Sequence, residues 1–346
     1  MRYKVLGKTG LFVSELCLGT MTFGTHSGRF ASATGVGQEE ADAIVRRAFD
    51  EGINFIDTAN VYTGGQSEEI TGRALKNLGI ARQDVVISTK VEGAMGKGPN
   101  DSGASRYHIM EQVKASLKRL GTEHIDLYQI HAWDSATSLE EVVRALDDLV
   151  RQGLVRYVGV SNWAAWQVVQ ALGVAERLNA TRLHSVQSYY SLVGRELERE
   201  IVPMLEAQGL GLMVWSPLAS GYLSGKYRDG KSGGRRTSID FPPINEERGE
   251  VVLDALDGIA VTHGVSMAAI SIAWLLHQRP VTSVILGAKR LEQLEDNLKA
   301  TEVRLSESEL KTLDEASAIV PEYPGWMAQM HNVERRVLFE SGELPR

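Results

Sequence analysis

The sequence predicts an α/β fold, a (β/α)8 TIM barrel, from two observations. Short apolar segments alternate with longer amphipathic segments, and this alternation repeats eight times. Such alternation is typical of a parallel sheet, and eight units can close into a barrel. The chain has 346 residues, a length that an α/β barrel can hold as one domain.

The predicted strands are short apolar runs without strict alternation, as expected of strands that are buried on both faces. An N-terminal β-hairpin is predicted before them, because Tyr3–Val5 and Phe12–Val13 flank a Gly-rich turn. The eight barrel strands are expected at Leu16–Leu18, Asn54–Ile56, Val85–Ser88, Ile125–Ile130, Val155–Val160, Leu183–Val186, Leu210–Val214 and Ser283–Leu286.

The segments between the strands carry apolar residues at helical spacing and predict amphipathic helices. Several end at a glycine, which is typical of a helix C-terminus. These helices are expected at Gln38–Glu51, Ser67–Leu78, Arg106–Leu120, Ser138–Arg151, Trp163–Leu178, Arg195–Ala207 and Leu291–Ala300.

Some segments depart from the simple repeat. Thr25–Gly37 is small and polar and predicts a flexible loop after the first barrel strand. Ala219–Arg248 is a long loop after strand 7, rich in Gly, Ser, Arg and Pro, and loops of that length are usually functional or disordered. Helical patterns at Gly249–His263 and Met267–Gln278 both precede the last strand, so one of them is an added helix.

A further helix, Glu307–Ala318, is expected after the barrel. We therefore expect a single barrel domain over residues 1–320 and a C-terminal tail over residues 321–346.

Composition argues against several classes of protein. Lys and Arg total 37 against 44 Asp and Glu, so the net charge is −7, which disfavours nonspecific binding to nucleic acid or to an anionic membrane. The single cysteine, Cys17, excludes an intramolecular disulfide and a Cys-cluster zinc site. The first ten residues lack the apolar core of a signal peptide, and no run approaches the ~18 apolar residues of a transmembrane helix. A cytoplasmic location is the simplest expectation.

Polar, glycine or aromatic residues follow every predicted strand. Active sites of such barrels lie at the C-terminal ends of the strands, so these residues are the first candidates for function. They are Gly19 and Thr20, Asp57, Lys90, His131, Ser161 and Asn162, Gln187, Trp215 and Ser216, and Gly287.

Asp57, Lys90 and His131 stand at three successive strand ends. Lys90 beside Asp57 would form an ion pair, and a nearby cation favours ionisation of a phenol. Tyr62 lies five residues beyond Asp57, within reach of the same mouth, and a tyrosine of lowered pKa can exchange a proton near neutral pH. Taken alone, a tyrosine at this position is more often an ordinary loop residue, and it is the combination with Asp57, Lys90 and His131 that points to a role.

The order of these residues resembles the aldo-keto reductase superfamily, over roughly Tyr3 to Ala318. The resemblance is carried by Gly52–Ala59 (GINFIDTA), Asp126–His131 (DLYQIH) and Trp215–Leu218 (WSPL), together with Ser88-Thr89-Lys90 and Gly159-Val160-Ser161-Asn162. The long loop and Ser224–Tyr227 (SGKY) resemble the bacterial branch that is related to potassium-channel β subunits.

The resemblance implies an NADPH-dependent oxidoreductase that reduces an aldehyde or ketone to the alcohol by hydride transfer. It implies that Tyr62 is the general acid, that Lys90 lowers the pKa of Tyr62 and that Asp57 holds Lys90. His131 would orient the carbonyl oxygen. No Gly-x-Gly-x-x-Gly follows a predicted strand, so no Rossmann domain is expected.

The resemblance also implies a nicotinamide cofactor bound in extended form. Ser161, Asn162 and Gln187 would bind its carboxamide, and Trp215 would stack on the ring. Lys289 and Arg236 match positions near the adenosine ribose and favour NADP(H), although each could be a plain surface cation. The expected cofactor-binding residues are Thr20, Met21, Asp57, Ser161, Asn162, Gln187, Trp215, Ser216, Leu218, Ser220, Lys226, Arg236, Gly287, Lys289, Gln293, Asp296 and Asn297. Asp296 stands where the family usually has Glu.

Met21, Phe23 and Trp133 could form an apolar substrate wall, or could equally be packed core. The wall would favour bulky or cyclic carbonyl substrates. The expected pocket is Met21, Phe23, Tyr62, His131 and Trp133, and the expected partner is a small-molecule carbonyl or alcohol compound.

Three other readings compete. Asp57 and Asp134 could be the paired carboxylates of a barrel glycosidase, but Lys90 and Trp215 would then have no role. A metal hydrolase lacks support, because no His-x-His follows the first strand and no His-Glu-x-x-His occurs. A nucleotide-binding regulatory subunit with little turnover is the third, and the complete set of Asp57, Tyr62, Lys90 and His131 favours catalysis over it.

Overall fold

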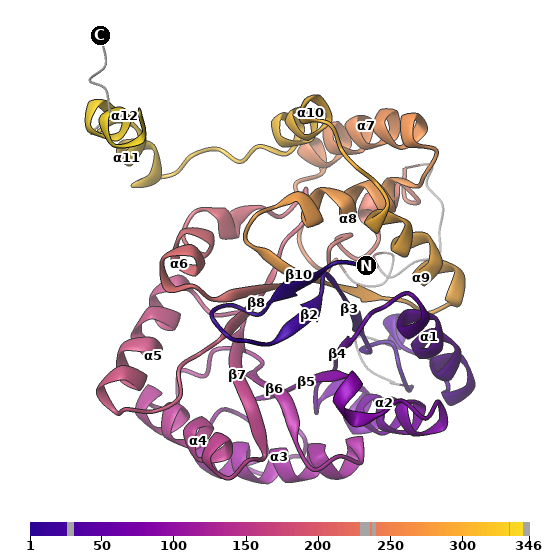
Figure 1. Cartoon of the computed structure of the whole chain (residues 1–346), viewed down its shortest axis with the longest axis vertical. Helices are drawn as coiled ribbons and strands as arrows, with labels where there is room; N and C mark the ends of the chain where they lie inside the picture. Colours follow the sequence, from indigo (N-terminus) through magenta and orange to yellow (C-terminus); the bar gives the residue numbers. More distant parts are fainter. Residues whose placement is uncertain (26–30, 229–235, 237–239, 332, 342–346) are drawn as a thin grey trace.

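The computed structural model describes residues 1–25, 31–228, 236, 240–331 and 333–341. Eight parallel strands form a closed barrel, in the order β10-β3-β4-β5-β6-β7-β8-β9, and helices surround it (Figure 1). The predicted (β/α)8 barrel is therefore confirmed. The strands are β3 (Leu16–Gly19), β4 (Phe55–Asp57), β5 (Val86–Val91), β6 (Ile125–Ile130), β7 (Val155–Ser161), β8 (Ser185–Tyr189), β9 (Gly211–Trp215) and β10 (Val281–Gly287).

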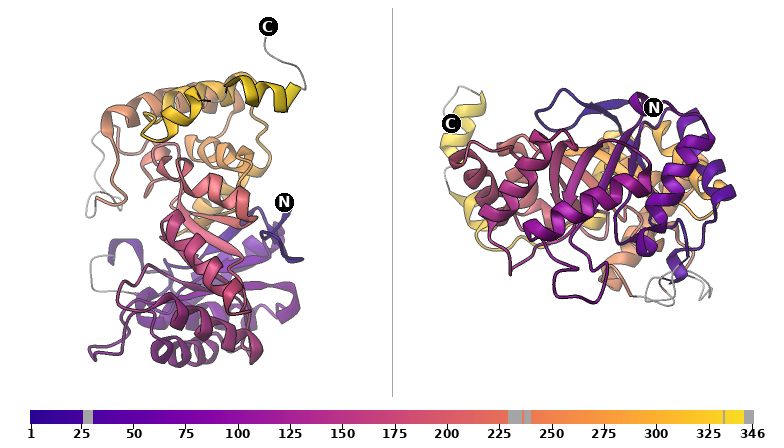
Figure 2. Two further views of the ribbon diagram at one scale, coloured as in Figure 1. Left: turned by 90° about the vertical axis from the view of Figure 1, so that its left-hand side faces the viewer. Right: turned by 90° about the horizontal axis from the view of Figure 1, so that it is seen from below.

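The helices outside the barrel follow the predicted segments closely. They are α1 (Gln38–Asp50), α2 (Gln66–Asn77), α3 (Arg106–Leu120), α4 (Leu139–Arg151), α5 (Ala165–Arg177), α6 (Ile201–Gln208), α7 (Glu246–His263), α8 (Met267–His277) and α9 (Leu291–Leu298). Figure 2 shows these helices as a layer outside the strands.

One predicted helix, Arg195–Ala207, is in fact divided. A short 3-10 turn at Glu196–Glu198 is followed by α6, which begins at Ile201. Pro203 explains the break, because its ring would clash with the carbonyl of the residue four positions earlier in a continuous helix. In the first turn of α6 the same proline is tolerated, since that turn needs no N–H donor there.

The predicted hairpin, β1 (Tyr3–Val5) and β2 (Phe12–Ser14), closes the barrel at the end opposite the strand C-termini. Its residues Leu6 and Val13 are fully buried and belong to one apolar cluster with Cys17, Phe55 and Leu127 of the barrel interior. The Lys4 ammonium donates to the carbonyl of Val281 at the start of β10, 2.7 Å away. Water is thereby excluded from the barrel floor.

The helices α7 and α8 both lie between β9 and β10, so the added helix is present. Nearly every residue of α8 is buried. Among the described residues, no single helix is long and apolar enough to span a bilayer, and the one pair that passes on length and composition, α7 with α8, is bent by 97°.

The two long loops are described only in part. Residues 26–30 of the predicted Thr25–Gly37 loop lie outside the described residues, while Ala31–Ala33 forms a 3-10 turn. In the loop after β9, residues 229–235 and 237–239 lie outside them. Tyr222–Ser224 forms a 3-10 turn in that loop, and α7 begins three residues before the helix predicted from Gly249.

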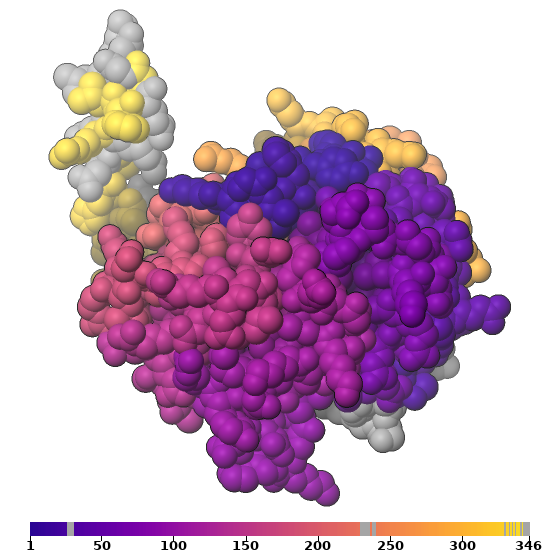
Figure 3. All heavy atoms as spheres, turned by 60° about the horizontal axis from the view of Figure 1, so that its bottom comes forward, coloured from indigo at the N-terminus to yellow at the C-terminus, as the bar shows by residue number. Residues whose placement is uncertain are grey.

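Three further helices follow β10 and α9: α10 (Glu307–Ser317), α11 (Gly325–Met330) and α12 (Val333–Ser341). Figures 1 and 3 show that α11 and α12 stand away from the barrel as an arm. An ion pair between Arg199 and Glu322, 3.0 Å long, connects the base of this arm to the residues just before α6.

The contact between α2 and α3 requires a glycine. A Cβ at Gly72 would lie 2.3 Å from the carbonyl oxygen of Leu120, whereas a Cβ at Gly173 in α5 would meet nothing within 4 Å. We predict that Gly72→Ala lowers the free energy of unfolding by about 1–3 kcal/mol through overpacking. Gly173→Ala should raise it by about 0.5–1 kcal/mol, since alanine favours helix. Denaturant unfolding of both variants checks this, and a stable Gly72→Ala would contradict the close packing.

Candidate functional site

Four polar side chains from the ends of three successive strands, β4, β5 and β6, meet at the C-terminal mouth of the barrel. The Lys90 ammonium lies 2.5 Å from Oδ2 of Asp57 and 3.4 Å from the phenolic oxygen of Tyr62. The rings of Tyr62 and His131 meet edge to face, with centroids 5.6 Å apart. The structure therefore brings together all four residues expected to be catalytic.

Lys90 is fully buried and has three oxygen partners: the Asp57 carboxylate, the Thr58 carbonyl at 2.8 Å and the Tyr62 hydroxyl. Burial opposes its positive charge, but the adjacent Asp57 carboxylate and Tyr62 together outweigh burial and raise the pKa of Lys90 above its usual value. The ammonium group is therefore charged at neutral pH and directed at the phenol.

Asp57 is held on its other carboxylate oxygen by three donors. Oδ1 accepts from the Ser88 hydroxyl at 2.9 Å, from Gln187 Nε2 at 3.0 Å and from Gln129 Nε2 at 3.3 Å. These bonds leave one oxygen for Lys90 and fix the orientation of the carboxylate.

His131 follows β6, and its backbone N–H continues the ladder by donating to the Val91 carbonyl at 2.8 Å. Burial, assisted by the nearby Lys90 charge, lowers the pKa of His131 to about 3. The imidazole is therefore neutral near pH 7, so it can donate one hydrogen bond but carries no charge.

The turn that places Tyr62 has three successive residues in the left-handed region. Their φ angles are 49° at Thr63, 66° at Gly64 and 97° at Gly65. The Thr63 hydroxyl donates to the Phe23 carbonyl at 2.9 Å and accepts from the Ser67 N–H in the first turn of α2. The two glycines permit this backbone conformation, and the hydrogen bonds of the Thr63 hydroxyl stabilise it.

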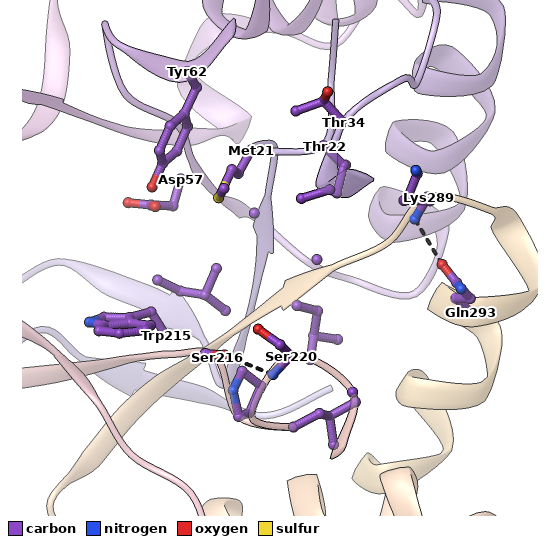
Figure 4. Close-up of a pocket in the computed structure, with 18 of the residues that line it drawn as sticks. Met21, Thr22, Thr34, Asp57, Tyr62, Trp215, Ser216, Ser220, Lys289 and Gln293 are labelled. Carbon is purple, nitrogen blue, oxygen red and sulfur yellow. Dashed lines mark hydrogen bonds between the residues drawn. The ribbon is translucent and has the colours of Figure 1, made fainter. Parts of the chain in front are cut away.

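A cavity of about 1340 Å³ extends from Tyr62 and His131 past Trp215 to the start of α9. Figure 4 shows Tyr62 and Asp57 toward one end and Lys289 and Gln293 toward the other. Most residues expected to contact the cofactor line it: Met21, Asp57, Ser161, Asn162, Gln187, Trp215, Ser216, Leu218, Ser220, Lys226, Gly287, Lys289, Gln293, Asp296 and Asn297.

Asn162 connects the two sides of the mouth. Its Nδ2 donates to the backbone carbonyl of His131, and its Oδ1 accepts from the indole N–H of Trp215, both at 3.0 Å. The Trp215 ring has two aromatic neighbours, Tyr189 at 5.1 Å and Phe241 at 5.7 Å between centroids. The Phe241 ring is nearly parallel to the indole, with 7° between their planes.

Phe241 is a lining residue that sequence reasoning missed. The Ser220 hydroxyl donates to its backbone carbonyl at 2.6 Å and so draws the far end of the long loop against the cavity. The same loop also contains the aromatic residues Tyr222 and Tyr227, so its sequence carried no signal that singled out Phe241.

At the other end of the cavity, the first turn of α9 is organised by Gln293, whose Oε1 accepts from the backbone N–H of Lys289 at 2.9 Å. The Lys289 ammonium reaches the Ser32 carbonyl at 3.0 Å. Asp296 accepts from the Ser266 hydroxyl at 2.6 Å. Arg290, which is not among the expected cofactor-binding residues, also lines the cavity.

Five expected site residues do not line the cavity. Arg236 pairs with Asp240 and donates to the Pro242 carbonyl at 2.7 Å, so its charge is directed into its own loop. Thr20 is fully buried, and its hydroxyl bonds Ser67 at 2.9 Å. Lys90 is fully buried and lies behind the lining residues Asp57 and Tyr62, both of which it contacts.

Phe23 and Trp133 of the expected substrate wall are the fourth and fifth of these residues. Phe23 is fully buried in the main core, where its backbone pairs with Val36. Trp133 packs edge to face against Trp163 and Trp166, at 4.8 and 5.8 Å between ring centroids. Phe23 therefore belongs to the core, and Trp133 packs against the other tryptophans beside it.

Asp134, the second carboxylate that a glycosidase would need, instead forms hydrogen bonds with the loops around it. It accepts from the Ala104 and Ala136 N–H groups and from the Thr137 hydroxyl. Partial burial opposes its ionisation, but these hydrogen bonds prevail and hold the pKa of Asp134 below its usual value. Its side chain does not line the cavity, so Asp57 and Asp134 do not form a pair of carboxylates that faces a substrate there.

A closed (β/α)8 barrel with this ion pair, phenol and imidazole at its mouth is the framework of a barrel oxidoreductase. Residues 15–318 match the aldo/keto reductase family, and the chain belongs to that family. The predicted resemblance is thereby confirmed.

Individual relatives cover nearly the whole chain. A protein of Arabidopsis thaliana named as a probable voltage-gated potassium channel subunit beta is 41% identical over 88% of this chain and 92% of its own length. An uncharacterized oxidoreductase of Bacillus subtilis is 38% identical, with 91% and 95% covered. The versiconal hemiacetal acetate reductase of Aspergillus parasiticus is 34% identical, with 94% and 99% covered.

The depressed pKa of His131 makes stability depend on pH. The unfolded imidazole binds a proton near pH 6.5, but the folded one does so only near pH 3. The free energy of unfolding is therefore highest above pH 6.5 and declines as the pH falls toward 3. Between pH 7 and pH 5 we expect the wild type to lose about 1–2 kcal/mol more than His131→Gln.

Urea unfolding at the two pH values measures this difference. His331→Gln, a substitution in the exposed arm, should keep the wild-type pH dependence. Equal losses in the wild type and in His131→Gln would show that His131 is protonated in the folded protein at pH 5.

Proposed function

We propose that the protein reduces an aldehyde or ketone to the alcohol by hydride transfer from NADPH, with Tyr62 as the general acid. The observation that supports this most directly is the Lys90 ammonium, buried and charged, 3.4 Å from the Tyr62 hydroxyl. The comparisons support the reaction class, because the family is one of oxidoreductases.

The electrostatics favour Tyr62 over His131 as the proton donor. With a pKa of about 3, His131 holds no transferable second proton near pH 7. It can donate its neutral N–H to a carbonyl oxygen and so orient the substrate. When the Tyr62 phenol gives up its proton, the Lys90 ammonium stabilises the phenolate that is left.

The lining residues suit a nicotinamide dinucleotide. Asn162 Oδ1 already accepts from Trp215 and has a second lone pair for a carboxamide N–H. Ser220 and Lys226 would hold the pyrophosphate, and the Lys289 and Arg290 cations lie at the opposite end from Tyr62. The bound cofactor would supply the hydride, while the protein supplies position and charge.

Bulky or cyclic carbonyl compounds are the proposed substrates. Phe23 and Trp133 do not support this, but Met21, Val61 and Phe241 give the cavity an apolar lining near Tyr62 and Trp215. NADPH consumption across sugars, short aldehydes, aromatic aldehydes and polycyclic ketones tests the proposal. Preference for sugars or short aldehydes would contradict the substrate class.

A nucleotide-binding regulatory subunit with little turnover is the second candidate. The similarity to plant proteins named as probable potassium channel subunits favours it. Tight NADPH binding without consumption of NADPH across the whole panel would select this candidate over the reductase.

Replacing the phenol tests the assigned acid. We predict that Tyr62→Phe lowers kcat for carbonyl reduction by at least about 100-fold, because general acid catalysis contributes about 10²–10⁴-fold. The dissociation constant for NADPH should change little. Tyr107→Phe removes a hydroxyl from an exposed tyrosine of α3 and should keep wild-type kcat. Retained activity in Tyr62→Phe would contradict the role of Tyr62.

Lys289 tests the choice of cofactor. We predict that Lys289→Ala weakens NADPH binding by about tenfold or more, since a charge-assisted hydrogen bond contributes about 1.5–3 kcal/mol. NADH binding should change little, because NADH lacks the 2′-phosphate. Fluorescence titration measures both, with Lys114→Ala on α3 as the control. Equal weakening of both cofactors would show that Lys289 does not contact the 2′-phosphate.

A further inference from the structure

A layer of polar side chains crosses the barrel interior directly beneath the candidate site. Ser88, Gln129, Ser185 and Gln187 are all buried, each at most 3% exposed. Toward the hairpin the interior is instead apolar, with Cys17, Phe55, Val86, Leu127, Met213 and Ile285. Burial of an amide costs free energy unless the amide is hydrogen-bonded. The hydrogen-bond partners of these buried side chains therefore indicate why polar residues stand here.

Gln129, on β6, has a residue of the candidate site on one neighbouring strand and a glycine on the other. In the strand register it is opposite Lys90 on β5 and opposite Gly159 on β7. A Cβ at Gly159 would lie 2.5 Å from the Ser185 hydroxyl and 3.5 Å from Gln129 Cγ. The missing side chain at Gly159 leaves room for the Ser185 hydroxyl, whereas a Cβ there would make only an ordinary van der Waals contact with Gln129.

The Gln129 amide donates one hydrogen bond to the Asp57 carboxylate and one to the Ser88 hydroxyl, which itself bonds that carboxylate. Nε2 donates to the Ser88 hydroxyl at 2.8 Å and to Asp57 Oδ1 at 3.3 Å, and the Ser88 hydroxyl itself donates to Asp57 Oδ1 at 2.9 Å. The opposite amide orientation would place the Gln129 oxygen against the carboxylate. The charge of Asp57 therefore determines the orientation of the amide.

Gln129 makes these bonds at a cost. Its Oε1 is buried and has no hydrogen-bond partner among the described residues. A buried unpaired acceptor costs about 1–3 kcal/mol, and an apolar side chain of the same length would avoid that cost. The hydrogen bond to Asp57 explains why a polar residue stands at this position despite that cost.

We propose that Gln129 is a positioning residue for the proposed reduction, which orients Asp57 and disperses its negative charge so that the Lys90 ammonium acts fully on the Tyr62 phenol. This inference rests on the proposed function. The titratable and charged groups that face Asp57 are Lys90 from β5, Tyr62 from the turn after β4, His131 after β6 and Cys17 from β3. The described partners from β8 are neutral.

Removal of the Gln129 donors concentrates negative charge on Asp57. That charge opposes phenolate formation at Tyr62, so the phenol holds its proton to a higher pH. Reduction needs the protonated phenol and is maintained at pH 7, whereas alcohol oxidation needs the phenolate and slows. A purely structural defect would slow both directions together.

The experiment compares the pH profiles of kcat/KM in three variants. In Gln129→Met the basic limb for reduction should move up by about 0.5–1 pH unit, as expected for the loss of one hydrogen bond. Ser88→Ala should move it in the same direction and carries the test if Gln129→Met does not fold. Ser185→Ala removes a hydroxyl from the same layer without contact to Asp57 and should leave the profile unchanged.

Coincident profiles for wild type and both variants would overturn the inference, as would equal slowing of the two directions without a shift. Lack of turnover in the wild type would instead refute the proposed reductase. The inference is then tested by tyrosinate absorbance, taken as the difference between each protein and its Tyr62→Phe form. The Tyr62 signal should appear at higher pH in Gln129→Met, and an unchanged midpoint would overturn the inference.

Discussion

The ion pair between Lys90 and Asp57 is the interaction on which the rest of the site depends. Transfer of an ammonium and a carboxylate out of water costs several kcal/mol per ion, even after the protein relaxes. Here the Thr58 carbonyl contacts the ammonium, and three donors contact Asp57 Oδ1. Each added hydrogen bond offsets part of the cost of desolvation. Lys90 therefore keeps its positive charge next to Tyr62.

The barrel supplies the conditions that this pair needs. Parallel register places Asp57 opposite Ser88 on β5, two residues before Lys90, so the two charged groups meet across adjacent strands. The hairpin and the apolar cluster around Phe55 exclude water from below. In that dry surrounding the charge of Lys90 is felt by the Tyr62 phenol and by the His131 imidazole, whose pKa it helps to lower.

Membership of one family does not decide between the two candidate activities, since similar chains are named as reductases and as channel subunits. The distinction lies in the site. A regulatory nucleotide-binding protein needs the cavity from Trp215 to Lys289, but has no use for a charged lysine beneath a phenol. The energetic cost of burying Lys90 is therefore the feature that favours catalysis.

Local pattern alone determined the eight strands, the surrounding helices and the strand-end positions of Asp57, Lys90 and His131, because burial on both faces leaves apolar runs in the chain and polar residues where the runs end. Only the tertiary structure decided which neighbour each side chain meets across the barrel. Phe23 is buried in the core, and Trp133 packs against another tryptophan. Arg236 forms an ion pair with Asp240, and Gln129 donates a hydrogen bond to Asp57 on a different strand. A residue's periodicity reports the face that it occupies, whereas its partner depends on strand order, register and the space left by residues such as Gly159, which are distant in the chain.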